Sequence, residues 1–123
     1  MTFMCRGIRG ATTAESNTKE NILAATTELL KEVVEGNNVD KNDVAALFFT
    51  TSPDLNAEFP AVAARQMGFV LVPLLCGHEM AVPDALGKCI RILILVNTEK
   101  RADEINHIYL RDAVNLRKRG FEC

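Results

Sequence analysis

One segment constrains the fold more than any other: a run of apolar residues with a single arginine inside it, Cys89-Ile90-Arg91-Ile92-Leu93-Ile94-Leu95-Val96. Strands that are buried on both faces have continuous apolar sequences, whereas strands with one solvated face alternate. We therefore predict a strand over Cys89–Thr98 that lies in the middle of a sheet. The rest of the chain has to supply the neighbouring strands and the helices that cover them.

Hydrophobic spacing predicts the elements on either side of this strand. Residues 17–36 have apolar side chains at helical intervals, with Asn17 and Glu20 in the form of a capping box and Gly36 at the position that ends a helix. Pro73 favours an edge strand or a bulge in the predicted strand 69–76, because proline cannot donate to a ladder. The other predicted elements are strand 2–12, strand 44–51, helix 59–67 and strand 104–110, before a basic tail, 111–123, that we expect to be partly mobile.

The order β-α-β-α-β-β-β predicts one α+β domain over residues 1–123, built as a mixed five-stranded sheet with helices on one face. The other face of such a sheet would be strongly apolar. A lone subunit of this size does not leave a large apolar face in water, so we expect the protein to form an oligomer.

Composition excludes several classes of function. Lys and Arg total 14 against 16 Asp and Glu, a net charge of -2, which supplies no cationic surface for nucleic acid. No apolar run reaches the roughly 18 residues that span a bilayer, and the N-terminus does not read as a signal peptide. The four cysteines lie far apart, as expected of reduced thiols in a cytoplasmic protein. No metal site is predicted, because neither His78 nor His107 has a partner at a ligand spacing, and the motif that begins at His78 fails as H-E-x-x-H at Val82.

Arg91 is the most informative candidate, since burying an unpaired guanidinium costs several kcal/mol. Either an anionic ligand meets it, or it forms an internal ion pair, or it lies at an exposed strand start. Glu79 follows a predicted strand, at the kind of edge where ligand groups gather, although a solvated loop carboxylate has the same sequence.

The remaining candidates are Arg9, Cys76, Arg65 and Arg117. Arg9 lies between Gly7 and Gly10, where a ligand can approach the backbone closely and an anion can meet the side chain. Cys76 has no visible catalytic partner, so packing or a backbone role is favoured over a nucleophile. Arg65 and Arg117 read as solvated surface charges.

Five segments, in order along nearly the whole chain, resemble the AroH-type chorismate mutases. They are Arg6-Gly7-Ile8-Arg9-Gly10-Ala11-Thr12-Thr13, Ser52-Pro53-Asp54-Leu55 with Phe59-Pro60-Ala61, Cys76 with Glu79-Met80, Cys89-Ile90-Arg91, and His107-Ile108-Tyr109-Leu110. The resemblance implies a trimeric pseudo-barrel and an isomerase that needs no cofactor. Its reaction is the pericyclic Claisen ([3,3]-sigmatropic) rearrangement of chorismate to prephenate, in phenylalanine and tyrosine biosynthesis. The active sites of the homotrimer would lie between subunits.

The resemblance also implies roles for individual residues. Arg91 would meet the ether oxygen that gains negative charge, Arg9 and Tyr109 would hold carboxylates, and Glu79 would accept from the ring hydroxyl. Cys76 would act through its backbone. The remaining implied substrate contacts are apolar walls at Phe59, Ala61, Leu74 and Leu116, Leu75 beside Cys76, and peripheral charges at Arg65 and Arg117.

Two positions depart from the family pattern. Val62 stands where a lysine is usual, and Leu75 stands where a threonine is usual. Without a cation at the entrance of the site, the substrate and the transition state should both bind more weakly, and to a similar extent. We therefore expect a raised KM and a near-normal kcat.

Three other functions remain open from the sequence. The first is a regulatory module that binds an aromatic-pathway carboxylate without turnover. The second is another trimeric enzyme such as a reactive imine deaminase, for which no motif is visible. The third is a structural trimer in which Arg91 pairs internally.

Overall fold

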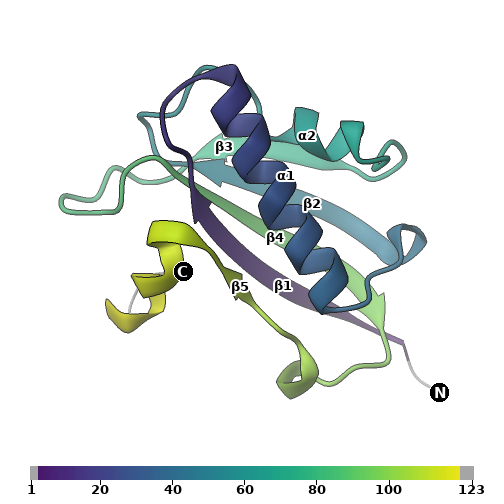
Figure 1. Cartoon of the computed structure of the whole chain (residues 1–123). Helices are drawn as coiled ribbons and strands as arrows, with labels where there is room; N and C mark the ends of the chain where they lie inside the picture. Colours follow the sequence, from purple (N-terminus) through teal and green to yellow (C-terminus); the bar gives the residue numbers. More distant parts are fainter. Residues whose placement is uncertain (1–2, 120–123) are drawn as a thin grey trace.

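The computed structural model describes residues 3–119, of which 117–119 are described by their backbone alone. Five strands form a single sheet, and two α-helices and three 3-10 helices connect or cover them (Figure 1). The strands are β1 Met4–Thr13, β2 Val44–Thr51, β3 Leu74–His78, β4 Cys89–Thr98 and β5 Ile108–Tyr109. The helices are α1 Lys19–Gly36, α2 Ala61–Gln66, η1 Lys41–Asp43, η2 Ala102–Glu104 and η3 Arg111–Arg119.

The sheet is mixed, with the strand order β3-β2-β4-β1-β5. β4 pairs antiparallel with β1 and with β2, while the two edge strands pair parallel, β3 with β2 and β5 with β1. The predicted bounds and the central position of β4 are therefore confirmed, and so is the edge position that Pro73 indicated for β3.

α1 and α2 cover one face of the sheet, which we call the helix face (Figure 1). The apolar side of α1 packs on alternate residues of β1 and β4, because successive side chains of a strand point to opposite faces. Gly10 lets α1 come close: a Cβ there would lie 3.1 Å from side-chain atoms of both Leu29 and Val33. The buried core on this face is made of Ile8, Leu29, Leu30, Val33, Val44, Leu47, Phe49, Ala61, Ala64, Phe69, Ile92, Ile94 and Val96.

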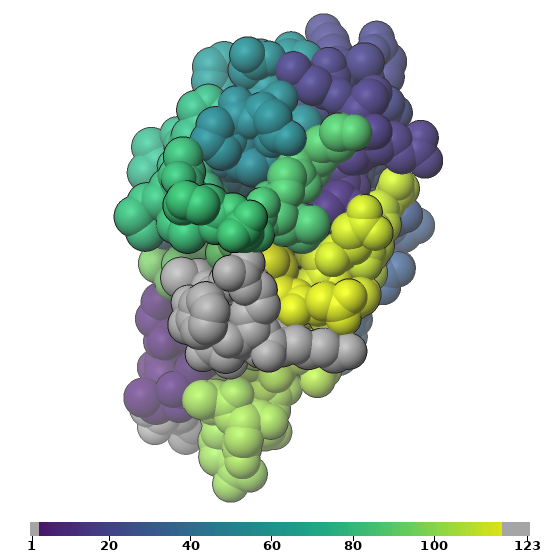
Figure 2. Space-filling model, turned by 90° about the vertical axis from the view of Figure 1, so that its left-hand side faces the viewer, coloured from purple at the N-terminus to yellow at the C-terminus, as the bar shows by residue number. Residues whose placement is uncertain are grey.

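The opposite face, which we call the arginine face, is only partly covered. At one end Ala113 and Leu116 of η3 pack on Ala11 and Cys89 of the sheet. Figure 2 shows η3 beside the segment that leads into β4, and Leu86 of that segment contacts the same cluster. Elsewhere this face leaves apolar side chains in solvent, since Leu75 is 61% exposed and Leu93 is 37% exposed.

The predicted start and end of α1 are wrong in detail. Thr18, not Asn17, is the N-cap, and its side chain accepts from the backbone N–H of Asn21 at 3.1 Å. Asn17 instead donates to the side chain of Asn56 at 2.8 Å, so a tertiary contact takes the residue that we expected to cap the helix. Gly36 is still helical, and the chain turns out of the helix through Asn37 and Asn38, the latter with a positive φ of 51°.

The predicted elements differ from the structure in further places. β1 ends one residue later than predicted, at Thr13, and α2 covers only Ala61–Gln66 of the predicted 59–67. Residues 69–73 are not in a strand, because β3 begins only after Pro73 and continues to His78. The last strand covers two residues of the predicted 104–110. Residues 111–119, expected to belong to a mobile tail, form η3, whereas residues 120–123 lie outside the described residues. No described helix has the length and apolarity needed to cross a bilayer.

Candidate active site

The register of the sheet gathers the predicted charged residues on the arginine face. Arg91 pairs with Ala11 of β1 and Thr50 of β2, and Ala11 pairs in turn with Tyr109 of β5. One row of the sheet therefore runs from β2 to β5 through Arg91. Arg9 lies opposite Leu93, two residues along β4 from Arg91, so both arginines point to the same face.

Arg91 and Glu79 form an ion pair on this face. The Nε of Arg91 lies 3.7 Å from Oε2 of Glu79, and the two side chains are 18% and 31% exposed. The hydroxyl of Thr50 donates to the same carboxylate oxygen at 2.6 Å. The internal ion pair that the sequence left open is therefore present, and the carboxylate in it belongs to another predicted site residue. The pair is longer than a hydrogen bond, and both side chains are partly exposed.

Arg9 and Tyr109 each have a buried polar atom with unused hydrogen-bonding capacity. Neither Nε of Arg9 nor the hydroxyl of Tyr109 has a hydrogen-bond partner in the described part of the chain. Buried polar groups are nearly always satisfied in proteins, so two such atoms on one face need an explanation. A polar ligand or a second subunit would supply one.

A second group of predicted residues lies on the other face, around α2 and β3. A pocket of about 410 Å³ is lined there by Phe59, Pro60, Cys76 and His78 among others. Phe59 is 69% exposed at the start of α2, whereas Ala61 is buried. Arg65 is exposed at the end of the same helix, and Leu74 is half-buried against the core.

Cys76 packs against the core between these residues. Burial raises the pKa of its thiol, although a backbone hydrogen bond from Ala61 and the charge of Arg65 act in the opposite direction. A thiol with a raised pKa stays protonated and is a poor nucleophile. This agrees with the interpretation of Cys76 as a packing or backbone residue.

One chain therefore divides the predicted residues between two faces of its sheet. The arginine face holds Arg9, Glu79, Arg91 and Tyr109, together with Leu75 and the buried Leu116 of η3. The helix face holds Phe59, Ala61, Arg65, Leu74 and Cys76. The side chain of Arg117 lies outside the described residues. The sheet itself separates the two groups, so a single subunit does not bring them together.

Sequence reasoning missed Thr50, which orients Glu79. Nothing distinguishes this threonine in the sequence, since its relation to Glu79 and Arg91 depends on the pairing of β2 with β3 and β4.

The Ser52-Pro53-Asp54 segment forms a set of hydrogen bonds, which we call the clasp, between the end of β2 and the start of β4. The backbone N–H of Cys89 donates to the hydroxyl of Ser52 at 2.9 Å, and that of Lys88 donates to Asp54 Oδ2 at 2.9 Å. The hydroxyl of Ser52 donates to Asp54. This bond, helped by the N–H of Lys88, holds the pKa of Asp54 below its usual range. The clasp fixes the start of β4 two residues before Arg91.

No group of three or more His, Cys, Asp or Glu side chains among residues 3–119 is arranged to hold a metal ion.

Comparison with known proteins gives consistent matches over the whole fold. The model of the family described as "Chorismate mutase type I" matches residues 5–119. Chorismate mutase AroH of Thermus thermophilus is 49% identical over 115 residues, which cover 93% of this chain and 94% of that protein. Chorismate mutase AroH of Bacillus subtilis (strain 168) is 45% identical over 116 residues, or 94% of this chain and 91% of that protein. A solved structure of a chorismate mutase from Clostridium thermocellum superposes with a TM-score of 0.86 at 46% identity, covering 88% of this chain and 96% of that one.

Proposed function

The chain belongs to the type I chorismate mutase family, and we propose that it rearranges chorismate to prephenate at a site whose charged half is the arginine face. The observation that carries this assignment is the convergence of Arg91, Glu79, Arg9 and Tyr109 on one face of the sheet. Chorismate has two carboxylates, a ring hydroxyl and an ether oxygen, and this set of side chains offers a partner for each.

Arg91 is the group that acts on the transition state. As the carbon–oxygen bond breaks, negative charge grows on the ether oxygen, and a guanidinium on the central strand of the sheet can meet it without reorganising. β4 is held on both sides by β1 and β2, and the clasp at Ser52 holds its start. A preorganised donor of this kind contributes roughly 3 to 4 kcal/mol.

Orientation of the substrate has to supply much of the remaining acceleration. A million-fold acceleration requires about 8 kcal/mol, which one donor does not provide. In the proposed site Arg9 and Tyr109 hold carboxylates and Glu79 accepts from the ring hydroxyl, so that the side chain of the substrate lies over its ring. The rearrangement transfers no proton to the protein and forms no bond with it, so it asks for neither a general base nor a nucleophile.

We propose that the complete site forms between subunits of a homotrimer. The division of the predicted residues between two faces supports this, because the helix face of one subunit can meet the arginine face of the next. An interface between two different patches generates a closed ring when the rotation closes. The exposed Leu75 and Leu93 are apolar surface that such an interface would cover.

In the assembled site the helix face contributes walls more than charge. Phe59, Ala61 and Leu74 are apolar, and Cys76 offers backbone groups. Arg65 is the remaining cation on α2, since the family's usual lysine is replaced by Val62. The free thiols of Cys5 and Cys76 suit the reducing cytoplasm, where we place the protein.

The test is direct turnover. The purified protein, treated with a chelator, is incubated with chorismate while the loss of chorismate and the gain of prephenate are followed. We expect prephenate to form with saturation kinetics. Binding of chorismate by calorimetry without turnover would instead assign the chain to the regulatory alternative, and no binding at all would reject both.

A further inference from the structure

β5 is a short edge strand, yet it carries Tyr109 into the proposed site. It pairs with β1 at only two positions, Gly10 with Ile108 and Ala11 with Tyr109. A two-residue parallel pairing is weak by itself, so other contacts have to hold the connection between β4 and β5 in place.

A ring nitrogen extends this pairing by one position. The backbone N–H of Arg9 donates to Nδ1 of His107 at 3.0 Å. His107 directly precedes β5. Its imidazole therefore accepts the hydrogen bond from Arg9 one residue before the main-chain pairing of β5 with β1 begins. The contact fixes the hydrogen-bonding state of the ring, because a nitrogen that accepts cannot carry a proton. The residue whose backbone is bonded in this way is the proposed carboxylate ligand.

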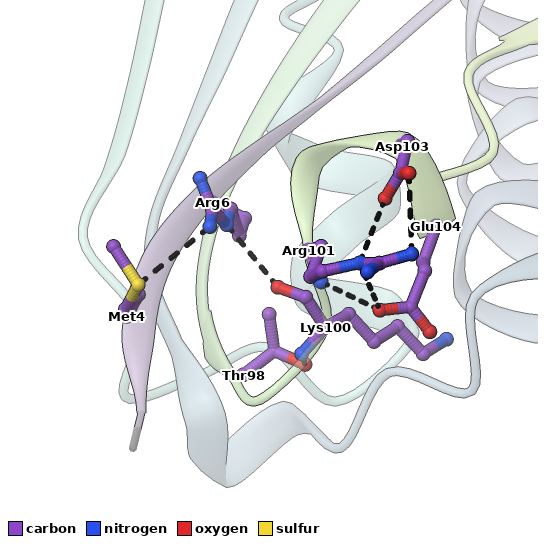
Figure 3. A network of polar contacts seen from close by, with 7 residues as sticks. All are labelled: Met4, Arg6, Thr98, Lys100, Arg101, Asp103 and Glu104. Carbon is purple, nitrogen blue, oxygen red and sulfur yellow. Dashed lines mark hydrogen bonds and ion pairs between the residues drawn. The ribbon is translucent and has the colours of Figure 1, made fainter.

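The connection that delivers His107 is braced at its start. Nε of Arg6 donates to the carbonyl of Lys100 at 3.2 Å, and the backbone N–H of Arg101 donates to Glu104 at 2.9 Å (Figure 3). The side chain of Arg101 also contacts Asp103, with Nε 3.2 Å from Oδ1. These contacts close the turn around η2 and tie it to β1.

A buried asparagine braces the other end of the connection. Asn37, 4% exposed at the end of α1, donates to the carbonyl of Asn106 at 2.8 Å and accepts from its N–H at 2.8 Å. Lys100 reaches the same place, since its Nζ donates to the carbonyl of Asn37 at 2.7 Å. His107 therefore follows Asn106, whose backbone N–H and carbonyl both form hydrogen bonds with the side chain of Asn37.

We propose that His107 is a positioning residue for Arg9, and that the brace from Asn37 to Asn106 aims its ring. This inference rests on the proposed function, because it gives the imidazole a role only if Arg9 binds a substrate carboxylate. His107 itself does not touch the substrate. The hydrogen bond to His107 fixes the backbone of Arg9. The backbone in turn sets the direction in which the guanidinium extends from β1.

The test compares two substitutions of nearly equal size. His107→Asn keeps an acceptor close to the position of Nδ1, whereas His107→Leu removes it. We expect His107→Leu to raise KM for chorismate by roughly 3- to 10-fold, as for the loss of one hydrogen bond, with a smaller fall in kcat. His107→Asn should stay within about twofold of the wild type for the same reason. Glu99→Gln, an exposed residue of the same connection, is the control and should change neither constant.

A second readout does not depend on activity. Amide hydrogen exchange at Arg9 should be faster in His107→Leu than in His107→Asn, and His107→Phe replaces the leucine variant if that one does not fold. The proposal is overturned if His107→Leu keeps the wild-type KM, or if His107→Asn loses as much as His107→Leu while both are folded. A wild-type protein that binds no chorismate would reject the proposed function instead, and the exchange rates would still report whether the bond holds Arg9.

Discussion

The two faces of the sheet differ in what they leave to solvent and in how their polar groups are held. On the helix face α1 and α2 bury a continuous core, and the residues assigned to substrate there are apolar or lie at the helix ends. On the arginine face η3 and Leu86 cover one end of the sheet, and charged side chains lie among exposed leucines. Arg91 is 18% exposed within that face and Phe59 is 69% exposed on the other.

This difference indicates that the two faces have different roles in the proposed reaction. The backbone of Arg91 is held by strand pairing on both sides, which suits a group that stabilises a transition state. Residues at the start of a short helix and along an edge strand can adapt to a partner, which suits walls that close a site. We therefore expect substitutions of Arg91, which acts on the transition state, to lower kcat, and substitutions on the helix face to change KM.

The largest effect is expected at Arg91. Arg91→Ala should lower kcat by about 10²- to 10³-fold, the usual cost of removing a donor at a developing oxyanion. Arg91→Lys keeps the charge but not the forked geometry and should recover only part of the rate. Steady-state kinetics on both variants provide the measurement. A variant Arg91→Ala with wild-type kcat would break the assignment of chemistry to this face.

Thr50→Val should have the next largest effect. It removes the hydrogen bond to Glu79 with almost no change in shape, and bonds to charged groups contribute about 1.5 to 3 kcal/mol. We expect kcat/KM to fall by roughly tenfold, because Glu79 loses its orientation beside Arg91. Thr12→Val is the matched control, since the buried hydroxyl of Thr12 has no partner within residues 3–119. Equal losses in the two variants would contradict the role of Thr50.

A smaller effect is expected on the helix face. Val62→Lys restores the cation that the family usually has on α2, and it should lower KM by a few-fold at low salt while kcat stays the same. The gain should shrink as salt is added, because a rim charge is screened. Val62→Gln tests polarity without charge and should leave KM unchanged. A change confined to kcat would count against the division between the faces.

The smallest effect is expected on the thermal stability of the fold, at the clasp between β2 and β4. The lowered pKa of Asp54 means that its contribution is present above the unfolded value, about 3.9, and is lost as pH falls through the lower folded value. Asp54→Asn should therefore lower Tm by about a few degrees at pH 7, and the difference from the wild type should close as pH falls through the folded pKa of Asp54. Ser52→Ala removes the leading cause of the shift, so its difference in Tm should also narrow at low pH, but the part due to the lost acceptor of the Cys89 N–H should remain at every pH. A difference in Tm that is constant with pH would contradict this account.

Strands made of long apolar runs could be read from the sequence with few errors. β2 and β4 have their predicted bounds, because an unbroken apolar run has no other stable place than the inside of a sheet. Local signals were less reliable where a distant residue competed for the same group. Asn17 had the right spacing for a cap, but its side chain bonds to Asn56 and Thr18 caps the helix.

The candidate site was predictable as a set of residues but not as a geometry. Arg91 stood out because a charge in an apolar strand demands a partner, yet its pairing with Glu79 depends on how far β3 runs past Pro73. Thr50 reaches Glu79 because of the register of the sheet, and His107 accepts a hydrogen bond from Arg9 through a ring nitrogen. Neither contact corresponds to a pattern that a single sequence shows.

The most direct test of the account asks whether the two faces work across a subunit boundary. Arg91→Ala destroys the arginine face of a subunit and leaves its helix face intact. Phe59→Asp does the reverse, because a carboxylate at an exposed wall position repels a dianionic substrate. Each variant alone should be nearly inactive.

The two variants are then mixed in equal amounts under conditions that exchange subunits, and activity is compared with that of the wild type. If each site joins the arginine face of one subunit to the helix face of the next, about one quarter of the sites in a random mixture combine two intact faces. The mixture should therefore recover about a quarter of the wild-type kcat per subunit. Mixed oligomers seen by native mass spectrometry, with activity no higher than the mean of the two variants, would contradict the account.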